Sequence, residues 1–420
     1  MIRRKEVWFS LKMKKNTIKY LAARKRVKEL ESLIQDYSEQ KDKIPDGITL
    51  WPKIEKNQKR LQAAFNATVQ QWQDWHWQVE NRICEVELLA ELLSLNAKQK
   101  QDMEQVCRSF RFGISPYYLS LIVDEIPNPL YRQAIPSIEE ILDRQGQADP
   151  MAEEKSAPAP AVVQRYPDRV IINVTNRCAM FCRHCQRRRR IGQTDKNTST
   201  NDLLAAIEYI RAHKQIRDVL ITGGDALMLD DRLLDWLLTE LEKVPHVEIK
   251  RLGTRVPVTL PMRITDKLCS MLSRHLPLYL NTQFNHPLEI TPLAAQACLK
   301  LARSGIALGN QSVLLAGVND DAFVIKKLNQ MLLKIMVRPY YLFHAKPVMG
   351  TKHFRTSVEK GIEIIKSLRG TTSGLAIPTY VVNAPGGLGK IALYPQCLLD
   401  KNEDKVFLQT WEGKIIAYDN

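Results

Sequence analysis

The spacing of apolar and polar residues changes along the chain and separates a helical part from a mixed part. Residues 11–42 repeat apolar positions at helical spacing, the stretch IPDGITLWP interrupts them, and helical spacing resumes from about residue 53 to 125. The stretch 146–161, GQADPMAEEKSAPAPA, is rich in Pro, Ala and acidic residues, which is typical of a linker or surface loop. We therefore expect a basic helical extension at 1–50, a helical region at 51–145 and a linker at 146–161.

From about residue 162 the pattern alternates between short β-rich runs and segments of helical periodicity. The six β-rich runs are RVIINV, DVLITGG, VEIKRLGT, LYLNTQF, IALGNQSVLL and VRPYYLF. Repeated βα units predict a parallel sheet, here an α/β fold with a partial (β/α)6 barrel of the TIM type over 162–400. A β-rich end follows at 401–420. Functional side chains in such a barrel lie at the carboxyl ends of the strands.

Charge is distributed unevenly. The 420 residues carry a net charge of +15, and residues 1–60 hold 17 Lys or Arg against 8 Asp or Glu. We interpret the excess of positive charge in residues 1–60 as a solvated helical arm rather than as an arm that binds nucleic acid. No apolar run approaches the length of a membrane span, and the basic N-terminal residues lack the apolar core and cleavage site of a secretory signal. We therefore expect a cytoplasmic protein with reduced cysteines and no membrane partner.

Three of the eight cysteines lie within eight residues, directly after RVIINV. Cys178, Cys182 and Cys185 have the spacing C-x3-C-x2-C. Zinc would need a fourth ligand and usually paired C-x2-C spacing, whereas three thiolates leave one iron of a [4Fe–4S] cluster open. The stretch TGGD, Thr222 to Asp225, ends the second β-rich run, and its glycines allow backbone to approach a ligand closely.

These features together resemble a known family. The cysteine motif at the end of the first barrel strand is similar to that of the radical S-adenosylmethionine superfamily. From about Trp72 to Gly413 the chain resembles the lysine 2,3-aminomutase family, on the motifs RYPDRV, CRHCQRRR, ITGGDAL, NTQFNHPLEIT, LGNQSVLLAGVND, VRPYY, HFRT, GIEIIKSLRGTTSG and APGGLGK. The resemblance implies a barrel of the radical S-adenosylmethionine type and an isomerase that moves an α-amino group to the neighbouring carbon.

The resemblance also implies three cofactors and the residues that hold them. The three cysteines would hold a [4Fe–4S] cluster. S-adenosylmethionine would contact Thr222, Gly223, Gly224, Asp225 and Gln311. Pyridoxal 5'-phosphate would be bound covalently by Lys390, which ends a glycine-rich loop, and held by Arg165, Tyr166 and Arg169. Arg187 would grip the substrate α-carboxylate through two hydrogen bonds.

Two positions depart from the lysine enzymes of the family. Where those enzymes hold the distal ammonium of lysine with two aspartates, this chain has Lys346 and Asn383. A like charge about 4 Å away at an effective dielectric near 20 costs on the order of 4 kcal/mol, so the distal group of the natural substrate should be a carboxylate. This pair resembles the glutamate 2,3-aminomutase branch, which implies interconversion of L-glutamate and 3-aminoglutarate (β-glutamate) by radical 1,2-amino migration.

The sequence leaves three alternative functions open. They are a lysine 2,3-aminomutase, a radical S-adenosylmethionine enzyme acting on RNA, and a non-catalytic relative that only binds ligands. The chain ends at WEGKIIAYDN without a Cys-rich tail, so we predict no structural zinc. Gln283 stands where the lysine enzymes of the family have a histidine, and the sequence gives this exchange no functional role. The resemblance implies a small amino-acid substrate, a one-electron donor such as flavodoxin or ferredoxin, and a homo-oligomer.

Overall fold

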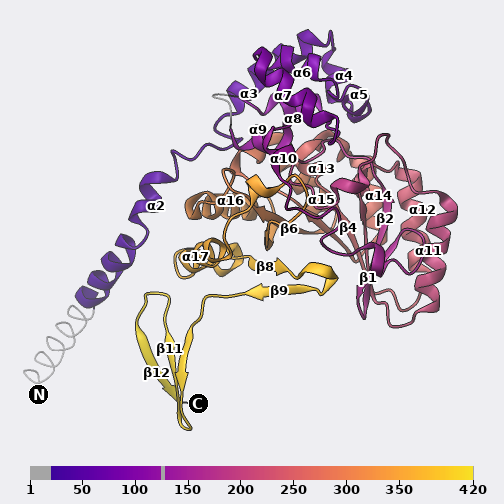
Figure 1. Cartoon of the computed structure of the whole chain (residues 1–420). Helices are drawn as coiled ribbons and strands as arrows, with labels where there is room; N and C mark the ends of the chain where they lie inside the picture. Colours follow the sequence, from indigo (N-terminus) through magenta and orange to yellow (C-terminus); the bar gives the residue numbers. More distant parts are fainter. Residues whose placement is uncertain (1–19, 124–127, 420) are drawn as a thin grey trace, which may run out of the picture. The chain divides into compact units, whose positions relative to one another are not determined.

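A computed structural model describes residues 20–123 and 128–419, which fall into two compact units, Met1–Ile44 and Pro45–Asn420. In the first unit, residues 20–32 are helical and α2 covers Gln35–Gln40 (Figure 1). The part of the predicted first helix before residue 20 lies outside the described residues.

Short helices make up the second unit before the sheet, as the periodicity predicts. They are α3 (Trp51–Ala64), α4 (Val69–Gln73), α5 (Trp75–Glu80), α6 (Val86–Leu92), α7 (Ala97–Cys107), α8 (Pro116–Ser120), α9 (Pro129–Ala134) and α10 (Glu139–Leu142). Two of them begin with reciprocal caps, because Thr68 pairs with Gln71 and Asn96 pairs with Gln99. These caps explain why helices of only 5 and 11 residues have defined starts.

A nine-stranded sheet in the order β1 to β9 forms the centre of the second unit. The strands are β1 (Val162–Tyr166), β2 (Arg169–Thr175), β3 (Asp218–Gly223), β4 (Ile249–Gly253), β5 (Leu278–Thr282), β6 (Ala307–Leu314), β7 (Val337–His344), β8 (Thr379–Asn383) and β9 (Lys390–Leu393). Strands β2 to β8 run parallel, whereas β1 and β9 are antiparallel edges. The sheet order is linear, so the barrel is partial.

The six β-rich runs correspond to β2 to β7, and β8 is a further parallel strand. Its residues, TYVVN, lie between Pro378 and Pro385, and no α-helical segment follows them, so they lack the βα alternation that marks the other parallel strands. A helix follows each of six strands: α11 (Thr200–Ala212), α12 (Asp231–Glu242), α14 (Asp266–Leu272), α15 (Pro292–Arg303), α16 (Ala322–Lys334) and α17 (Val358–Leu368); a short α13 (Val256–Thr259) precedes α14. The α/β fold and its partial barrel are confirmed.

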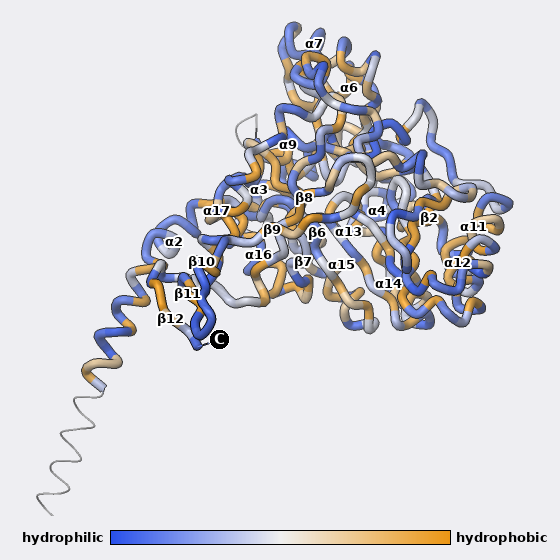
Figure 2. Tube along the Cα trace, turned by 60° about the horizontal axis from the view of Figure 1, so that its bottom comes forward, coloured by the Kyte–Doolittle hydropathy of each residue, from blue (hydrophilic) through white to orange (hydrophobic). Residues whose placement is uncertain are grey.

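The starts of these six helices are fixed chemically. Each follows a Ser, Thr or Asp whose side chain accepts a hydrogen bond from the first turn: Ser199, Asp230, Thr265, Thr291, Asp321 and Ser357. One face of each helix is buried, for example Leu234, Leu237, Leu238 and Leu241 of α12. In Figure 2, α11 and α12 alternate between hydrophobic and hydrophilic segments, as helices with one buried face should.

The carboxyl end of the chain forms a second, three-stranded antiparallel sheet of β10 (Leu398–Lys401), β11 (Lys405–Gln409) and β12 (Ile415–Asp419). Trp411 packs against Gly370, two residues after α17, since a Cβ placed on Gly370 would lie 2.1 Å from its indole ring. Across the described ranges, no helix combines the length and apolar character needed to cross a bilayer.

Candidate active site

A cavity of about 290 Å³ opens at the carboxyl ends of the parallel strands and brings the predicted site residues together. Its lining includes Arg165, Tyr166, Arg169, Cys178, Cys182, Cys185, Arg187, Thr222, Gly223, Gly224, Asp225, Gln311, Lys346, Asn383 and Lys390, and also Gln283. The cavity extends into the barrel as far as the β1–β2 turn. Predicted site residues as far apart in the sequence as Arg165 and Lys390 therefore line the same cavity.

The cysteine loop follows β2 and is anchored by the helical region. Arg183, 1% exposed, donates from Nε and Nη2 to the carboxylate of Glu140 at 2.9 and 2.7 Å. Burial opposes ionisation of Glu140, but Arg183 and Arg188 outweigh it and hold the pKa of Glu140 below its ordinary value. Arg82 donates to the carbonyl of Cys178 at 2.5 Å. The loop therefore has a fixed course between its cysteines.

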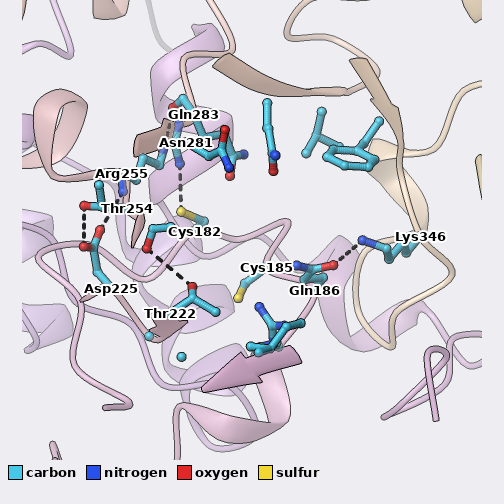
Figure 3. A pocket seen from close by; sticks show the side chains of 18 of the residues that line it. Cys182, Cys185, Gln186, Thr222, Asp225, Thr254, Arg255, Asn281, Gln283 and Lys346 are labelled. Carbon is cyan, nitrogen blue, oxygen red and sulfur yellow. Dashed lines mark hydrogen bonds between the residues drawn. The ribbon is translucent and has the colours of Figure 1, made fainter. Parts of the chain in front are cut away.

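The three thiol groups suit a cluster better than a single ion. Within the described residues, no three His, Cys, Asp or Glu side chains converge where one metal ion could lie. A [4Fe–4S] cluster needs no such convergence, because each thiolate binds a separate iron. Cys182 and Cys185 point their sulfur atoms to the cavity (Figure 3), and Arg255 donates from Nη1 to Sγ of Cys182 at 2.7 Å.

The glycines of TGGD lie against the base of the cysteine loop. Gly223 has φ of +137°, and a Cβ there would be 2.4 Å from the carbonyl oxygen of Thr175. A Cβ on Gly224 would be 2.4 Å from the carbonyl oxygen of Arg177. No larger residue fits either position, so a ligand beside this stretch meets bare backbone.

Asp225 connects two strand ends. Its carboxylate accepts hydrogen bonds from Thr254 Oγ1 at 2.5 Å and from the backbone N–H of Arg255 at 2.6 Å. Burial raises the pKa of Asp225. Both carboxylate oxygens are engaged, so Asp225 holds the loop after β4 in place as well as lining the cavity. In Figure 3, Asp225 and Lys346 lie at opposite ends of the view.

Lys390 and Asn383 come from one hairpin at the other end of the cavity. They are partners in the antiparallel pair β8–β9, and positive φ at Gly386, Gly387 and Gly389 forms the turn between them. The Nζ of Lys390 lies 5.2 Å from the ring centre of Tyr166. Burial, with help from nearby arginines, lowers the pKa of Lys390 to about 8.

The predicted phosphate-side residues flank Lys390. Arg169 lies 4.6 Å from the ring centre of Tyr166 and donates to Asp168 at 2.9 Å. Burial lowers the pKa of Arg165, which has no ion pair with any carboxylate that the structure describes. Gln311 reaches the cavity from β6, next to a bulge after Asn310.

Lys346 and Arg187 lie near each other, but only Arg187 has an acidic partner. The Nζ of Lys346 donates to Oε1 of Gln186 (Figure 3), and burial together with the charges of Arg187 and Arg165 lowers the pKa of Lys346 to about 7. Arg187 donates from Nε to Oε1 of Glu153 at 3.0 Å. Asn383 Nδ2 is buried and has no hydrogen-bond partner among the described residues.

The lining is strongly cationic. Seven Lys or Arg residues line it against one acid, Asp225: Arg165, Arg169, Arg187, Arg251, Arg255, Lys346 and Lys390. Four of these have a carboxylate partner, in the pairs Arg169–Asp168, Arg187–Glu153, Arg251–Asp218 and Arg255–Glu289. Arg165, Lys346 and Lys390 form no ion pair with a carboxylate in the described ranges. The cavity is therefore suited to a ligand set with several negative groups.

Sequence reasoning missed several lining or supporting residues. Arg255 follows β4 directly, so its strand-end position could have identified it. Gln186 follows Cys185, but its contact with Lys346 spans 160 positions and has no local signal. Gln283, a position without a predicted role, places its Nε2 3.0 Å from Nε2 of His184.

Comparison with known proteins identifies the family. Residues 172–324 match the Radical SAM superfamily, and residues 365–420 match the family described as Lysine-2,3-aminomutase. The chain is 51% identical over 396 residues to "Glutamate 2,3-aminomutase" of Clostridioides difficile, covering 94% of each sequence. It is 50% identical over 350 residues to "L-lysine 2,3-aminomutase" of Acetoanaerobium sticklandii, covering 83% of this chain and 84% of that protein.

A similar relation holds to "L-lysine 2,3-aminomutase" of Clostridium subterminale, at 48% identity over 83% of this chain and 84% of that protein. The two matched ranges include the cysteine loop, in 172–324, and Lys390, in 365–420. The chain belongs to the lysine 2,3-aminomutase family of radical S-adenosylmethionine enzymes, which are isomerases.

Proposed function

We propose that this protein is a glutamate 2,3-aminomutase, which interconverts L-glutamate and 3-aminoglutarate. The observation that carries the proposal is Lys346, an unpaired cation in the substrate end of the cavity. A substrate with a distal ammonium would add a like charge to Lys346, Arg187 and Arg165. A distal carboxylate would instead supply the missing counter-charge.

Two further features support a dicarboxylate substrate. The unpartnered Nδ2 of Asn383 is a donor that a carboxylate oxygen can satisfy, whereas an ammonium has no acceptor to offer it. Lys346 is also one of only three lining cations, with Arg165 and Lys390, that form no ion pair with a carboxylate in the described ranges. The name of the 51% identical relative, "Glutamate 2,3-aminomutase", agrees with this substrate.

The residues present fit the three cofactors of the family. Cys178, Cys182 and Cys185 would hold the [4Fe–4S] cluster, and Thr222 to Asp225 with Gln311 would hold S-adenosylmethionine beside it. Lys390 would bind pyridoxal 5'-phosphate, with Arg165, Tyr166 and Arg169 around it. When bound, the reduced cluster and S-adenosylmethionine supply a radical that removes and returns a hydrogen atom, and pyridoxal phosphate allows the amino nitrogen to migrate.

The remaining roles belong to the chain itself. The lowered pKa of Lys390 leaves part of its amine uncharged near neutral pH, the form that can bond to an aldehyde carbon. Arg187 binds the α-carboxylate and Lys346 the distal carboxylate, so the substrate is held at both ends.

Lysine is the second candidate substrate, because relatives named "L-lysine 2,3-aminomutase" are up to 50% identical. An anaerobic assay of the reconstituted protein with glutamate and lysine, each with its products identified, tests the choice. Glutamate should be converted faster and yield 3-aminoglutarate. Faster conversion of lysine would refute the substrate but leave the aminomutase chemistry intact.

The proposal extends to the surroundings of the enzyme. A one-electron donor such as flavodoxin or ferredoxin would reduce the cluster, and we expect a homo-oligomer in the cytoplasm. Cys178→Ala should abolish cleavage of S-adenosylmethionine, whereas alanine at the exposed Cys397 should leave it unchanged. Full cleavage by the Cys178 variant would contradict the assignment of the cluster ligands.

A further inference from the structure

Glu153 is a buried carboxylate surrounded by arginines. Its exposed fraction is 2%, and it lies in the segment that the sequence predicts as a linker or surface loop. Arg187 contacts it at 3.0 Å, Arg189 at 3.3 Å and Arg190 at 3.4 Å. Burial opposes its ionisation, but Arg187 first, then Arg190 and Arg165, lower the pKa of Glu153 to about 2. The group is therefore a permanent anion in the working range of pH.

The contact between Glu153 and Arg187 uses one edge of the guanidinium. Both Nε and Nη2 of Arg187 lie 3.0 Å from Oε1 of Glu153. The remaining nitrogen, Nη1, makes no hydrogen bond or ion pair with any residue that the structure describes. A guanidinium offers two such edges to carboxylates, so the Nη1–Nη2 edge is left for a second one.

The backbone around Glu153 fixes its position relative to the rest of the site. Gln147 exchanges hydrogen bonds with the loop after β7, through its N–H to Pro347 at 2.9 Å and its carbonyl from Met349 at 3.0 Å. The carbonyl of Pro150 accepts from the N–H of Gly386 at 2.9 Å. Segment 147–153 thus contacts the Lys346 loop, the Lys390 hairpin and the arginine run after Cys185.

We propose that Glu153 is a positioning residue for substrate binding: it clamps the Nε–Nη2 edge of Arg187, so that the opposite edge faces the cavity and receives the α-carboxylate. This inference rests on the proposed function, because it assigns the α-carboxylate to Arg187. Glu153 shares its charge with Arg189 and Arg190, at 3.3 and 3.4 Å, and leaves the Nη1–Nη2 edge of Arg187 uncovered. Glu153 therefore orients Arg187 without occupying the edge that would meet the substrate.

Binding of two free amino acids, glutamate and 4-aminobutyrate, distinguishes a positioning role of Glu153 from a purely structural role. Glutamate carries both carboxylates, whereas 4-aminobutyrate keeps the amine and the distal carboxylate but lacks the α-carboxylate. Binding of each to the holoenzyme, without S-adenosylmethionine, can be followed by the absorbance of the bound pyridoxal phosphate. Glu153→Gln should raise the Kd of glutamate by about 10- to 100-fold, the scale of a lost alignment, and change the Kd of 4-aminobutyrate less than about twofold.

Glu154→Gln is the matched control. Glu154 is the next residue, its side chain is 79% exposed, and it reaches Arg189 only at 3.7 Å. This variant should bind both ligands as the unmodified protein does. In an Arg187→Met background, Glu153→Gln should have no further effect on glutamate, because its action passes through Arg187.

Equal weakening of both ligands by Glu153→Gln, or no weakening of glutamate, would overturn the proposal. If Glu153→Gln does not fold, Glu153→Asp is the test, because aspartate keeps the charge but places it one carbon further from Arg187. Glu153→Asp should raise the Kd of glutamate and leave the Kd of 4-aminobutyrate nearly unchanged. If the unmodified protein binds lysine and not glutamate, the proposed substrate fails. The role of Glu153 is then tested with lysine, which has an α-carboxylate, and 1,5-diaminopentane, which is the same molecule without it.

Discussion

Asn383 and Lys390 are directly opposed residues of the antiparallel pair β8–β9, so their side chains leave the same face of the hairpin. Directly opposed Cβ atoms lie about 5 Å apart in such pairs. Backbone hydrogen bonds thus set the distance between the lysine proposed to bind pyridoxal phosphate and the amide proposed to meet the distal carboxylate.

Lys390 should be the residue that holds pyridoxal phosphate. Borohydride reduction followed by peptide mapping should place the label on Lys390, because it is the cavity-lining lysine nearest Tyr166 and burial lowers its pKa to about 8. Lys346 lines the same cavity and serves as the internal comparison. A label on Lys346 would mean that the two ends of the cavity have been exchanged.

Binding of glutamate should weaken as pH rises above about 7. Burial, then the charges of Arg187, Arg165 and Lys390, against the opposing charge of Glu153, lower the pKa of Lys346 to about 7. Below this pH the ammonium is present in the free protein, whereas above it glutamate binding must take up one proton. The Kd should then rise by up to about tenfold per pH unit.

The measurement is the Kd of glutamate from pH 6 to 9 in the protein and in Lys346→Arg. Arginine does not titrate in this range, so the variant should lack this part of the pH dependence. Identical profiles for the two proteins would show that Lys346 does not face the distal carboxylate.

Reversing the charge at the distal end should change substrate preference. Lys346→Met should cost roughly 2–5 kcal/mol in glutamate turnover, since it removes one partner of a partly buried charge pair. Cleavage of S-adenosylmethionine should persist, because Lys346 lies at the opposite end of the cavity view from Asp225. Lys346→Asp combined with Asn383→Asp should depress glutamate turnover further and admit some lysine.

Rates with both amino acids check this prediction. Lysine turnover should stay poor in the double variant, because specificity also requires correctly placed walls. Unchanged glutamate turnover in Lys346→Met would contradict the proposed pocket.

A glycine in α17 tests the packing behind the hairpin. A Cβ on Gly361 would lie 2.1 Å from the ring of Tyr380, which is fully buried and whose hydroxyl contacts His344 at 2.8 Å. Gly361→Ala should lower the free energy of unfolding by about 1–3 kcal/mol, despite the better helix propensity of alanine.

Gly374→Ala is the control, since a Cβ there meets no heavy atom within 4 Å. It should alter stability by less than about 0.5 kcal/mol. The midpoints of urea unfolding compare the two variants, and equal midpoints would contradict the packing described for Tyr380.

Local patterns in the sequence account for most of the fold, whereas the resemblance to the family supplied most of the predicted residues that line the cavity. Period-two and helical spacing predict β2 to β7 and the helices after them, because burial of one face imposes these periods. The motifs Cys178 to Cys185, Thr222 to Asp225 and Lys390 follow strand ends or a glycine turn, where a barrel concentrates its chemistry.

The remainder depends on pairings that no local pattern encodes. Glu153 lies in a Pro- and Ala-rich stretch and gains its role from Arg187, 34 positions later. Lys346 meets Gln186 across 160 positions. Only the folded chain brings these groups together, so composition alone predicts a loop where a buried anion is found.

The two edges of the sheet leave the barrel with a seam. No backbone pairing joins β1 to β9 in the part of the chain that the structure describes; instead a Cβ on Gly389 would lie 3.4 Å from the hydroxyl of Tyr166. A break of this kind can widen through loop movement without the loss of any strand pair. If Lys390 binds pyridoxal phosphate as proposed, the cofactor could reach it at this edge without the break of a strand pair, and the chain could fold before the cofactor binds.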